Sequence, residues 1–237
     1  MRYGLVGSEM CIRDSSGFDL QGDNIEWIQN VYFSSNSCWL FIPDDDQYRG
    51  KRVDLEVQPN SGILLDYGIS SHHLESDLIN LEASGTEWVS NPIPSGGSQP
   101  ILLNLGKPKL GTYSSISAKF RGHSLTKSSS PNHQLSITFG SVNGEQLGSL
   151  TSWTGNSSRL FYLSTESINL NEGVNIFYIK NLSPDSDSYP YLDYFELDYN
   201  RELNFDLNYE FQTPISNQDL RLSFSGQKPS DARLWNI

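Results

Sequence analysis

Residues 189–203 read YPYLDYFELDYNREL, and this stretch decides the fold class of the chain. Its apolar and aromatic residues Phe195, Leu197 and Tyr199 alternate with polar ones, which is the two-residue period of a half-buried strand. Pro190 stands at the start of the stretch, where a missing N–H group does least harm to a strand ladder. We therefore predict a central β-strand here, with Phe195, Leu197 and Tyr199 facing a core.

Similar alternation recurs at short spacing through the rest of the chain, and turn residues separate the segments. Asn143-Gly144 is the dipeptide that a type I′ hairpin turn prefers, because both central residues need positive φ. Alternating strands and helices are absent, which argues against a parallel α/β domain. We predict an all-β chain, with an antiparallel sandwich or jelly-roll-like domain preceded by a smaller β segment. Beyond the central strand, the predicted strands of the larger domain are residues 100–105, 114–120, 134–139, 145–150, 159–163 and 174–180, and two further strands are predicted after it at 206–211 and 219–225.

The chain divides into four parts in this interpretation. Residues 1–15 resemble translated read-through of a sequencing adapter, so we expect an artefact without order and leave them out of the fold. Residues 16–70 form a small β segment or the end of a preceding β domain, with strands expected at 31–33, 38–42, 51–57 and 63–69. Residues 71–203 form the sandwich, and residues 204–237 form strands that lead into a missing catalytic domain.

One short segment breaks the strand pattern. Leu74, Leu78 and Leu81 recur at helical spacing, which predicts a short helix over residues 73–83. Ser84-Gly85 ends it.

The chain is acidic, with 28 Asp and Glu against 16 Lys and Arg and a net charge of −12 over 237 residues. Such a surface repels phosphate groups, which excludes nucleic acid as an expected partner. No stretch reaches the roughly 18 consecutive apolar residues of a membrane helix, so we expect no transmembrane segment. These features favour an extracellular or cell-surface protein.

Nucleophilic catalysis has few candidates. The two cysteines are Cys11 and Cys38, and Cys11 falls in the adapter-like segment. Cys38 lies in a predicted strand, far in sequence from every histidine, so a buried apolar role is favoured over a thiolate–imidazole pair. The histidines are residues 72, 73, 123 and 133. Serine chemistry stays open, but no nucleophile elbow, phosphate loop or dinucleotide motif is present, and we assign no catalytic residue.

Metal and cofactor sites are equally sparse. His72 and His73 are adjacent, so on a strand they would point to opposite faces and not share one ion, and the start of a solvated loop is favoured instead. Asp44–Asp46 and the set Asp185, Asp187 and Asp193 are rich in oxygen ligands that suit calcium. Their spacing matches no EF-hand loop, and solvated acidic turns are favoured. We therefore assign no metal and no cofactor.

Sugar-related features are an alternative. Trp153, Tyr162, Tyr189 and Tyr191 are candidates for a sugar-stacking platform, although aromatic residues more often fill β cores. Two tripeptides, starting at Asn156 and Asn181, match the N-glycosylation acceptor, which matters only in a eukaryotic secretory pathway.

Three pieces of sequence, in their order and spacing, resemble one family. The first is DLIN at 77–80 followed by SGTEW at 84–88, the second is YLDYFELDYNREL at 191–203, and the third is LWNI at 234–237. They resemble the β-rich region upstream of the catalytic domain in gingipain-like, caspase-fold cysteine peptidases. Within that family, the resemblance is greatest to the type IX secretion system sortases of Bacteroidetes-type bacteria, and it covers residues 71–237.

The resemblance implies a secreted or outer-membrane surface protein of a bacterium, whose complete form carries a cysteine-type endopeptidase domain after Ile237. In the sortases that domain removes a C-terminal sorting signal from exported cargo and transfers the cargo to an anionic lipopolysaccharide. The family's catalytic histidine precedes a glycine, whereas His123 follows Gly122, and no cysteine here matches the nucleophile. No catalytic residue is therefore carried over to this chain.

Three functions remain open on the sequence. The sandwich is a positioning module that packs on the downstream peptidase domain or docks cargo or secretion components, with loops 124–132 and 183–188 as contact surfaces. The first alternative is a carbohydrate-binding module of a secreted bacterial protein, with glycan as the partner. The second alternative is a hydrolase of unknown kind.

Overall fold

The computed structural model describes residues 17–21, 24–28, 62–81, 87–124, 131–205, 211–214 and 220–228. The chain forms two compact units, Met1–Gly62 and Ile63–Ile237. In the first unit, β1 (Gly17–Gln21) and β2 (Asn24–Ile28) pair as an antiparallel hairpin. Cys11, Cys38, Asp44–Asp46 and the strands expected between residues 31 and 57 lie outside the described residues.

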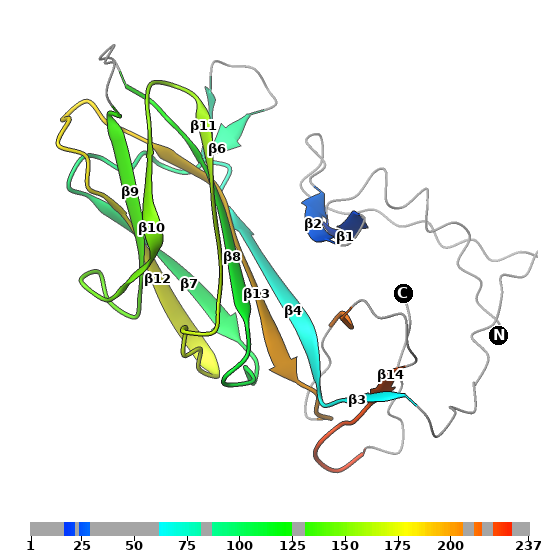
Figure 1. The fold of residues 1–237 in the computed structure, drawn as a ribbon. Coiled ribbons are helices and arrows are strands. Elements are labelled where there is room, and N and C mark those ends of the chain that lie inside the picture. Colours follow the sequence, from blue (N-terminus) through cyan, green and yellow to red (C-terminus); the bar gives the residue numbers. More distant parts are fainter. Residues whose placement is uncertain are drawn as a thin grey trace, which may run out of the picture. The chain divides into compact units, whose positions relative to one another are not determined.

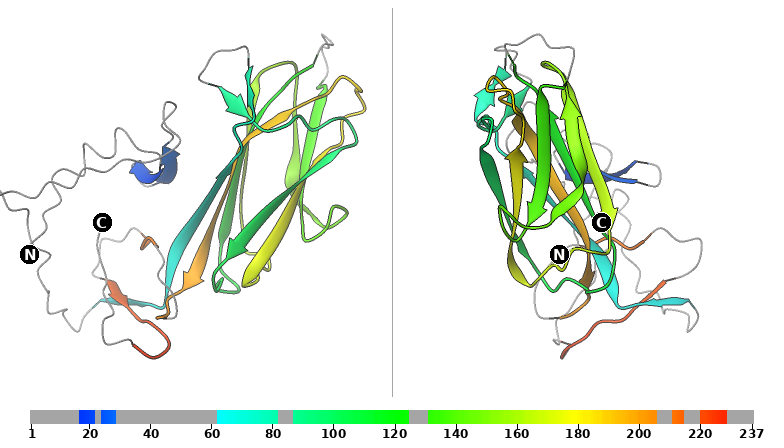
Figure 2. Two further views of the ribbon diagram at one scale, coloured as in Figure 1. Left: turned by 180° about the vertical axis from the view of Figure 1, so that it is seen from behind. Right: turned by 60° about the vertical axis from the view of Figure 1, so that its left-hand side comes forward.

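The second unit contains two four-stranded antiparallel sheets that face each other as a sandwich (Figures 1 and 2). We name each sheet after one of its central strands. The β12 sheet has the order β10 (Gln146–Trp153), β9 (His133–Phe139), β12 (Gly173–Asn181) and β7 (Ser98–Leu105). The β13 sheet has the order β11 (Ser158–Thr165), β8 (Ser114–Arg121), β13 (Tyr191–Glu202) and β4 (Tyr67–Glu75).

Two short pairs complete the described elements. The strand β3 (Ile63–Leu65) pairs in parallel with β14 (Leu220–Leu222), and β5 (Ile79–Asn80) pairs antiparallel with β6 (Trp88–Val89). The all-β sandwich prediction is confirmed. No helix among the described residues is long and apolar enough to span a membrane.

The stretch that reads as a central strand is β13, and it lies between β8 and β4. Phe195 and Leu197 are fully buried and Tyr199 is 2% exposed, as their alternation predicts. They stand opposite Ala118, Ile116 and Ser114 of β8, so the same face of each strand is turned inward. This shared face exists because the side-chain period of a strand is two, which fixes the register once one face is apolar.

Aromatic rings join the two sheets. The ring of Phe195 on β13 lies 5.3 Å from that of Phe177 on β12, and Phe177 lies 5.0 Å from Phe139 on β9. Tilted rings at these distances combine a large buried apolar area with favourable quadrupole geometry. The interior is therefore continuous from one sheet to the other.

The helix predicted over residues 73–83 is wrong. His73 to Glu75 belong to β4, and Ile79-Asn80 form β5. The leucines have helical spacing in the sequence, but they do not share one buried face. Leu74 stands opposite Phe195 in the sheet, whereas Leu78 is 58% exposed. A nine-residue ladder to β13 satisfies the backbone better than an isolated helical turn.

The hairpin at Asn143-Gly144 is confirmed, but its predicted type I′ turn is wrong. Six residues, 140–145, separate β9 from β10. The N–H group of Gly144 donates to the carbonyl oxygen of Ser141 at 2.9 Å, and Asn143 does not have positive φ. Gly140 takes the positive φ of 74° instead, because the longer loop needs its left-handed residue at the strand end.

Several strands run further than predicted. The strand β10 continues to Trp153, and its register to β9 shifts between Leu147 and Thr151. Gly148, with φ of 64°, lies in this irregularity, so the strand continues instead of ending. The strand β4 runs from Tyr67 to Glu75, past the end expected at residue 69, and the expected domain limits stay predictions.

Candidate functional site

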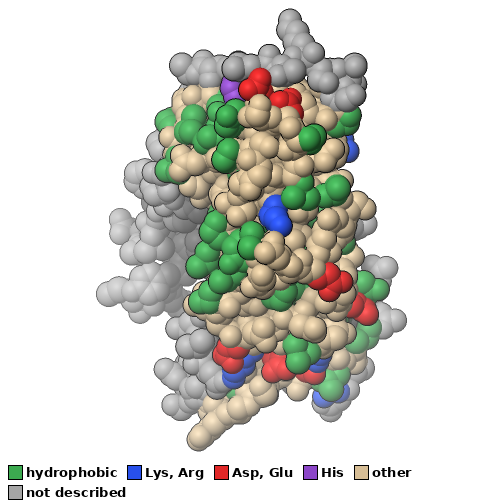
Figure 3. All heavy atoms as spheres, turned by 90° about the vertical axis from the view of Figure 1, so that its left-hand side faces the viewer, with side chains coloured by type: hydrophobic (Ala, Val, Ile, Leu, Met, Phe, Trp, Pro, Cys, Tyr) green, Lys and Arg blue, Asp and Glu red, His purple; other side chains and the backbone are tan. Residues whose placement is uncertain are grey.

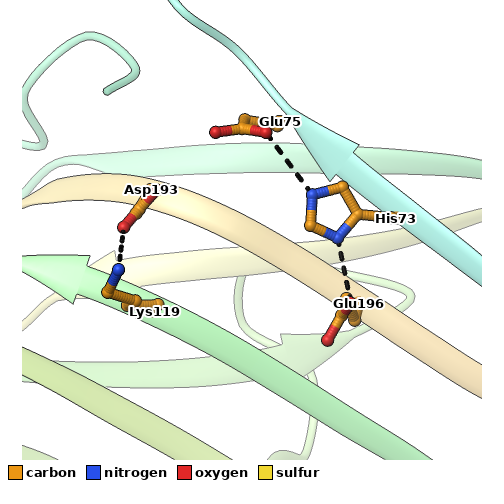
Figure 4. A network of polar contacts seen from close by, with 5 residues as sticks. All are labelled: His73, Glu75, Lys119, Asp193 and Glu196. Carbon is orange, nitrogen blue, oxygen red and sulfur yellow. Dashed lines mark hydrogen bonds and ion pairs between the residues drawn. The ribbon is translucent and has the colours of Figure 1, made fainter. Parts of the chain in front are cut away.

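The outer face of the β13 sheet carries a network of charged side chains (Figure 4). His73 on β4 stands directly opposite Glu196 on β13, and Nδ1 of His73 lies 3.0 Å from Oε1 of Glu196. The other ring nitrogen, Nε2, lies 3.5 Å from Oε2 of Glu75, two residues along β4. His73 is thus held between two carboxylates although its side chain is only 4% exposed.

The charges around His73 decide its protonation. Burial alone would lower the pKa of this imidazole, because it penalises the charged form. The hydrogen bonds and negative charges of Glu196 and Glu75 outweigh burial, and they raise the pKa above its ordinary value. The arrangement therefore favours an imidazolium bound by two acids.

A second ion pair lies next to the first. Nζ of Lys119 on β8 lies 2.7 Å from Oδ2 of Asp193, and the same ammonium lies 6.0 Å from the ring centre of Tyr194. The register of β13 against β8 shifts between Leu192 and Tyr194, so two residues of β13 meet Lys119. Burial would lower the pKa of Lys119, but the hydrogen bond from Lys119 to Asp193 raises it overall.

Asp198 extends the network along β13. Its cross-strand neighbours are Ser71 on β4 and Ser115 on β8, and the hydroxyl of Ser115 donates to Oδ2 of Asp198 at 3.1 Å. Burial raises the pKa of Asp198, and the nearby charge of Glu196 adds to that effect, while hydrogen bonds from both serines oppose it. Ionisation of this carboxyl is consequently less favourable than that of an aspartate in water.

The network consists of ion pairs and hydrogen bonds between neighbouring strands. Its members are carboxylates, an imidazole and an ammonium that bind one another, with the hydroxyl of Ser115 bonded to Asp198. Within the described part of the chain, no group of three or more histidine, cysteine and acidic residues is arranged to bind a metal ion. Pairs of opposite charge on neighbouring strands stabilise the register of the sheet, and most of these side chains are largely buried.

Another polar cluster is sealed at one end of the sandwich. Nδ1 of His133 lies 2.8 Å from Oγ of Ser188, and Nε2 lies 2.9 Å from the carbonyl oxygen of Gly155. Because a carbonyl only accepts, Nε2 carries the proton, and the Ser188 hydroxyl donates to Nδ1. Both side chains are completely buried, so this serine–histidine pair is closed to any substrate.

Asn181 connects the same cluster to its surroundings. Its Nδ2 donates to the carbonyl oxygens of Ile93 at 2.9 Å and Ser188 at 3.1 Å, and its Oδ1 accepts from the N–H group of Ser183. Burial lowers the pKa of His133, which favours the neutral ring that these bonds require. The hydrogen bonds of this cluster therefore connect β9, β12 and the loop of residues 182–190.

The aromatic residues proposed as a sugar platform do not come together. Trp153 is 7% exposed and lies in the core, 4.8 Å from the ring of His133 and 6.3 Å from that of Phe120. Tyr162 is 67% exposed on β11, whereas Tyr191 is on β13 and its ring contacts that of His123. The platform fails because Trp153 faces inward on β10.

The other expected site residues are placed as follows. His72 and His73 point to opposite faces, as predicted, but they lie in β4 rather than at the start of a loop, and the His72 ring stacks on Tyr199 at 5.8 Å. Asp193 pairs with Lys119, while the N–H group of Asp187 donates to Oδ1 of Asp185 at 2.9 Å in a local turn.

The two glycosylation tripeptides differ in exposure. Asn156 is exposed, and its Oδ1 accepts from the N–H group of Ser124. Asn181 is completely buried, so its tripeptide is not an acceptor in the folded protein.

Of the expected contact loops, Ser183 and Ser188 are buried, and residues 125–130 lie outside the described part.

Sequence reasoning missed the charged network. The signal was present in residues 189–203, where Glu196 and Asp198 alternate with the core residues. What the sequence could not supply was the cross-strand partner of each acid, because the register of β4 and β8 sets that partner.

Comparisons with known proteins bear on the fold. No protein-family model matches the sequence, and no curated protein matches it. The fold is similar to dimeric latent PorU from Porphyromonas gingivalis, with a TM-score of 0.51 and 16% identity over 62% of this chain and 14% of PorU. The chain thus spans only a small part of the length of PorU.

Two carbohydrate-binding modules are weaker matches. A family 35 module from Clostridium thermocellum has a TM-score of 0.32 and 14% identity over 54% of this chain and 90% of the module. The module CBM35 from Cellvibrio japonicus Abf62 has a TM-score of 0.31 and 11% identity over 54% of this chain and 92% of the module.

Proposed function

We propose that the chain is a non-catalytic β-sandwich region of a larger secreted or surface protein related to gingipain-like peptidases and type IX secretion sortases. Its role there is accessory: it positions the peptidase domain or docks the cargo. The observation that carries the proposal is the similarity in fold to a segment that makes up 14% of PorU. The sequence motifs at 77–88, 191–203 and 234–237 point independently to the sortases, the group to which PorU belongs.

The geometry of the polar clusters supports an accessory role. The serine–histidine pair of Ser188 and His133 is completely buried, and His73, whose side chain is 4% exposed, is held by Glu75 and Glu196. A nucleophile and its base must both reach a substrate, and neither pair allows this. This geometry supports a scaffold role for the described residues.

The carbohydrate-binding alternative finds less support. Its central aromatic residue, Trp153, is in the core, and the exposed Tyr162 stands on β11, away from Tyr191 on β13. Sugar binding by exposed aromatic rings depends on rings that lie together on one surface. A glycan array probed with the chain and its Tyr189→Ala and Tyr162→Ala variants tests this alternative, and we expect no binding at millimolar sugar.

The accessory proposal is tested by the natural coding sequence that contains this region. We expect it to encode, after residue 237, a histidine followed by glycine and then a cysteine, each at the end of a predicted parallel strand. A second test assays the purified chain with fluorogenic peptide substrates, and we expect no hydrolysis. Hydrolysis that copurifies with the chain, or a coding sequence without such a peptidase domain, would overturn the proposal.

A further inference from the structure

We propose that the outer face of β7 and β12 binds an extended apolar segment of a partner protein that also carries a carboxylate. The inference rests on the proposed accessory function, since it identifies a surface through which such a module would hold a partner. Three features of the described residues support it: an exposed apolar strip, a free strand edge and a cation that lacks an acidic partner.

The apolar strip consists of five side chains on two neighbouring strands. Cross-strand pairs place Ile176 beside Leu102 and Tyr178 beside Pro100, with Val174 next along β12. Leu102 is 55% exposed and Val174 is 63% exposed. Figure 3 looks onto this sheet and shows hydrophobic side chains gathered along it, with acidic side chains toward its ends. A contiguous apolar surface of this kind marks an interaction site more often than isolated exposed residues do.

The strip borders a sheet edge, because β7 pairs with β12 alone. Gly140 donates its N–H group to the carbonyl oxygen of Ile176 at 2.8 Å, so the even-numbered residues of β12 direct their backbone groups toward β9. The odd-numbered residues of β12 therefore bond to β7, where Phe177 stands opposite Ile101 and Asn175 opposite Leu103.

By the same alternation, Leu102 and Asn104 direct their N–H and C=O groups off the sheet edge. Pro100 has the same parity, which agrees with the rule that proline within a sheet turns its missing N–H outward at an edge. No hydrogen bond joins these outward groups to another described residue. The N–H groups of Leu102 and Asn104 can therefore bond to a short added strand, whose outward side chains would lie beside Leu102 at the border of the strip.

The charge at the end of the strip indicates what the partner carries. Lys180 follows Tyr178 on the outer face of β12, and its ammonium lies 3.3 Å from the amide oxygen of Asn143. Lys109 and Lys119 pair with acids, whereas Lys180 makes no ion pair with a described residue. A lysine without an acidic partner among the described residues is complementary to an acidic group on a partner.

Other occupants fit less well. The strip offers one aromatic ring, Tyr178, and aliphatic neighbours that cannot hydrogen-bond to sugar hydroxyls. A second copy docked by two-fold symmetry would bring another Lys180 and another net charge of −12 to the same contact. An extended peptide with alternating apolar residues and one acid satisfies all three features together.

The test uses the full chain, immobilised and probed with phage-displayed random linear dodecapeptides. We expect enrichment of peptides with alternating apolar residues and an Asp or Glu. A labelled synthetic copy of the most enriched peptide is then titrated by fluorescence anisotropy. Leu102→Glu and Lys180→Glu should each weaken its binding at least about tenfold, as should Val174→Glu. The matched control is Leu160→Glu, a change at a similarly exposed leucine on β11 of the other sheet.

Four outcomes would overturn the proposal. The first two are the absence of enriched peptides and equal peptide binding by Leu102→Glu and the wild type. The other two are binding of glycans that depends on the strip, and a concentration-dependent dimer in sedimentation that Leu102→Glu abolishes. Circular dichroism and urea midpoints test whether the variants are folded. If Leu102→Glu is unfolded, Leu102→Ser replaces it in the titration. None of these results bears on the peptidase domain sought after residue 237, so this proposal can fail while the accessory role stands.

Discussion

Phe195 on β13 packs against the opposite sheet in the centre of the core. Its side chain is completely buried, and its ring contacts that of Phe177 on the opposite sheet. We expect Phe195→Ala to lower the free energy of unfolding by about 3–5 kcal/mol, because it removes buried contacts and leaves a cavity. Urea titration followed by tryptophan fluorescence measures this loss. The control Tyr162→Ala, at an exposed position, should change stability by less than about 0.5 kcal/mol, and equal effects of the two would contradict the packing.

His133 makes stability depend on pH at the scale of one side chain. Burial lowers its pKa in the folded protein, so below about pH 6.5 the unfolded chain binds the proton more readily. The stabilising contribution is therefore complete above that pH and is lost as the pH falls through it. The charged and ionisable groups that act on this ring are Asp185, whose charge raises its pKa, and His123, which lowers it.

We expect His133→Gln to reduce the loss of stability between pH 7.5 and pH 5.5, whatever its effect at neutral pH. His72 has the same sign as His133, and His73 has the opposite sign, so the comparison is between variant and wild type at each pH. Urea midpoints across this range provide the measurement. An identical pH slope in the two proteins would show that His133 is not a buried neutral ring.

At the scale of the element, β13 separates two environments. Its inward residues fill the core, and its outward residues Glu196 and Asp198 stand among polar neighbours on β4 and β8. Burial raises the pKa of Asp198, so ionisation of this carboxyl is unfavourable in the sheet. Asp198→Asn should therefore increase stability at pH 7, with a smaller gain near pH 4, where the carboxyl takes up a proton itself. A loss of stability at pH 7 in chemical denaturation would contradict this account.

The elements also show what could be predicted from the sequence. Strands with one apolar and one polar face were predictable, because burial of alternate residues leaves a local pattern, as in β8, β12 and β13. The Leu74–Leu81 segment was not, since its spacing fits a helix while Leu74 pairs with the distant β13 and Ile79-Asn80 pair with β6. The charged network of His73, Glu196 and Lys119 depends on partners more than 70 residues apart, which only the register defines.

At the scale of the whole molecule, the described sandwich combines a sealed interior with two different outer faces. The β13 sheet presents ion pairs, and the β12 sheet presents the apolar strip with Lys180 at its end. A scaffold with one charged and one apolar face suits a region that contacts two neighbours, which is the accessory role that we propose. The strip test and the search for a downstream peptidase domain examine these two contacts separately.

Amide hydrogen exchange of β13, followed by mass spectrometry of peptides that span residues 191–202, tests the central claim most directly. The account predicts that the amides of Phe195 to Tyr199 exchange among the slowest in the chain, because β13 is bonded on both sides, to β8 and to β4. Exchange of these amides within seconds, at the rate of an exposed loop, would contradict a sandwich built around this strand.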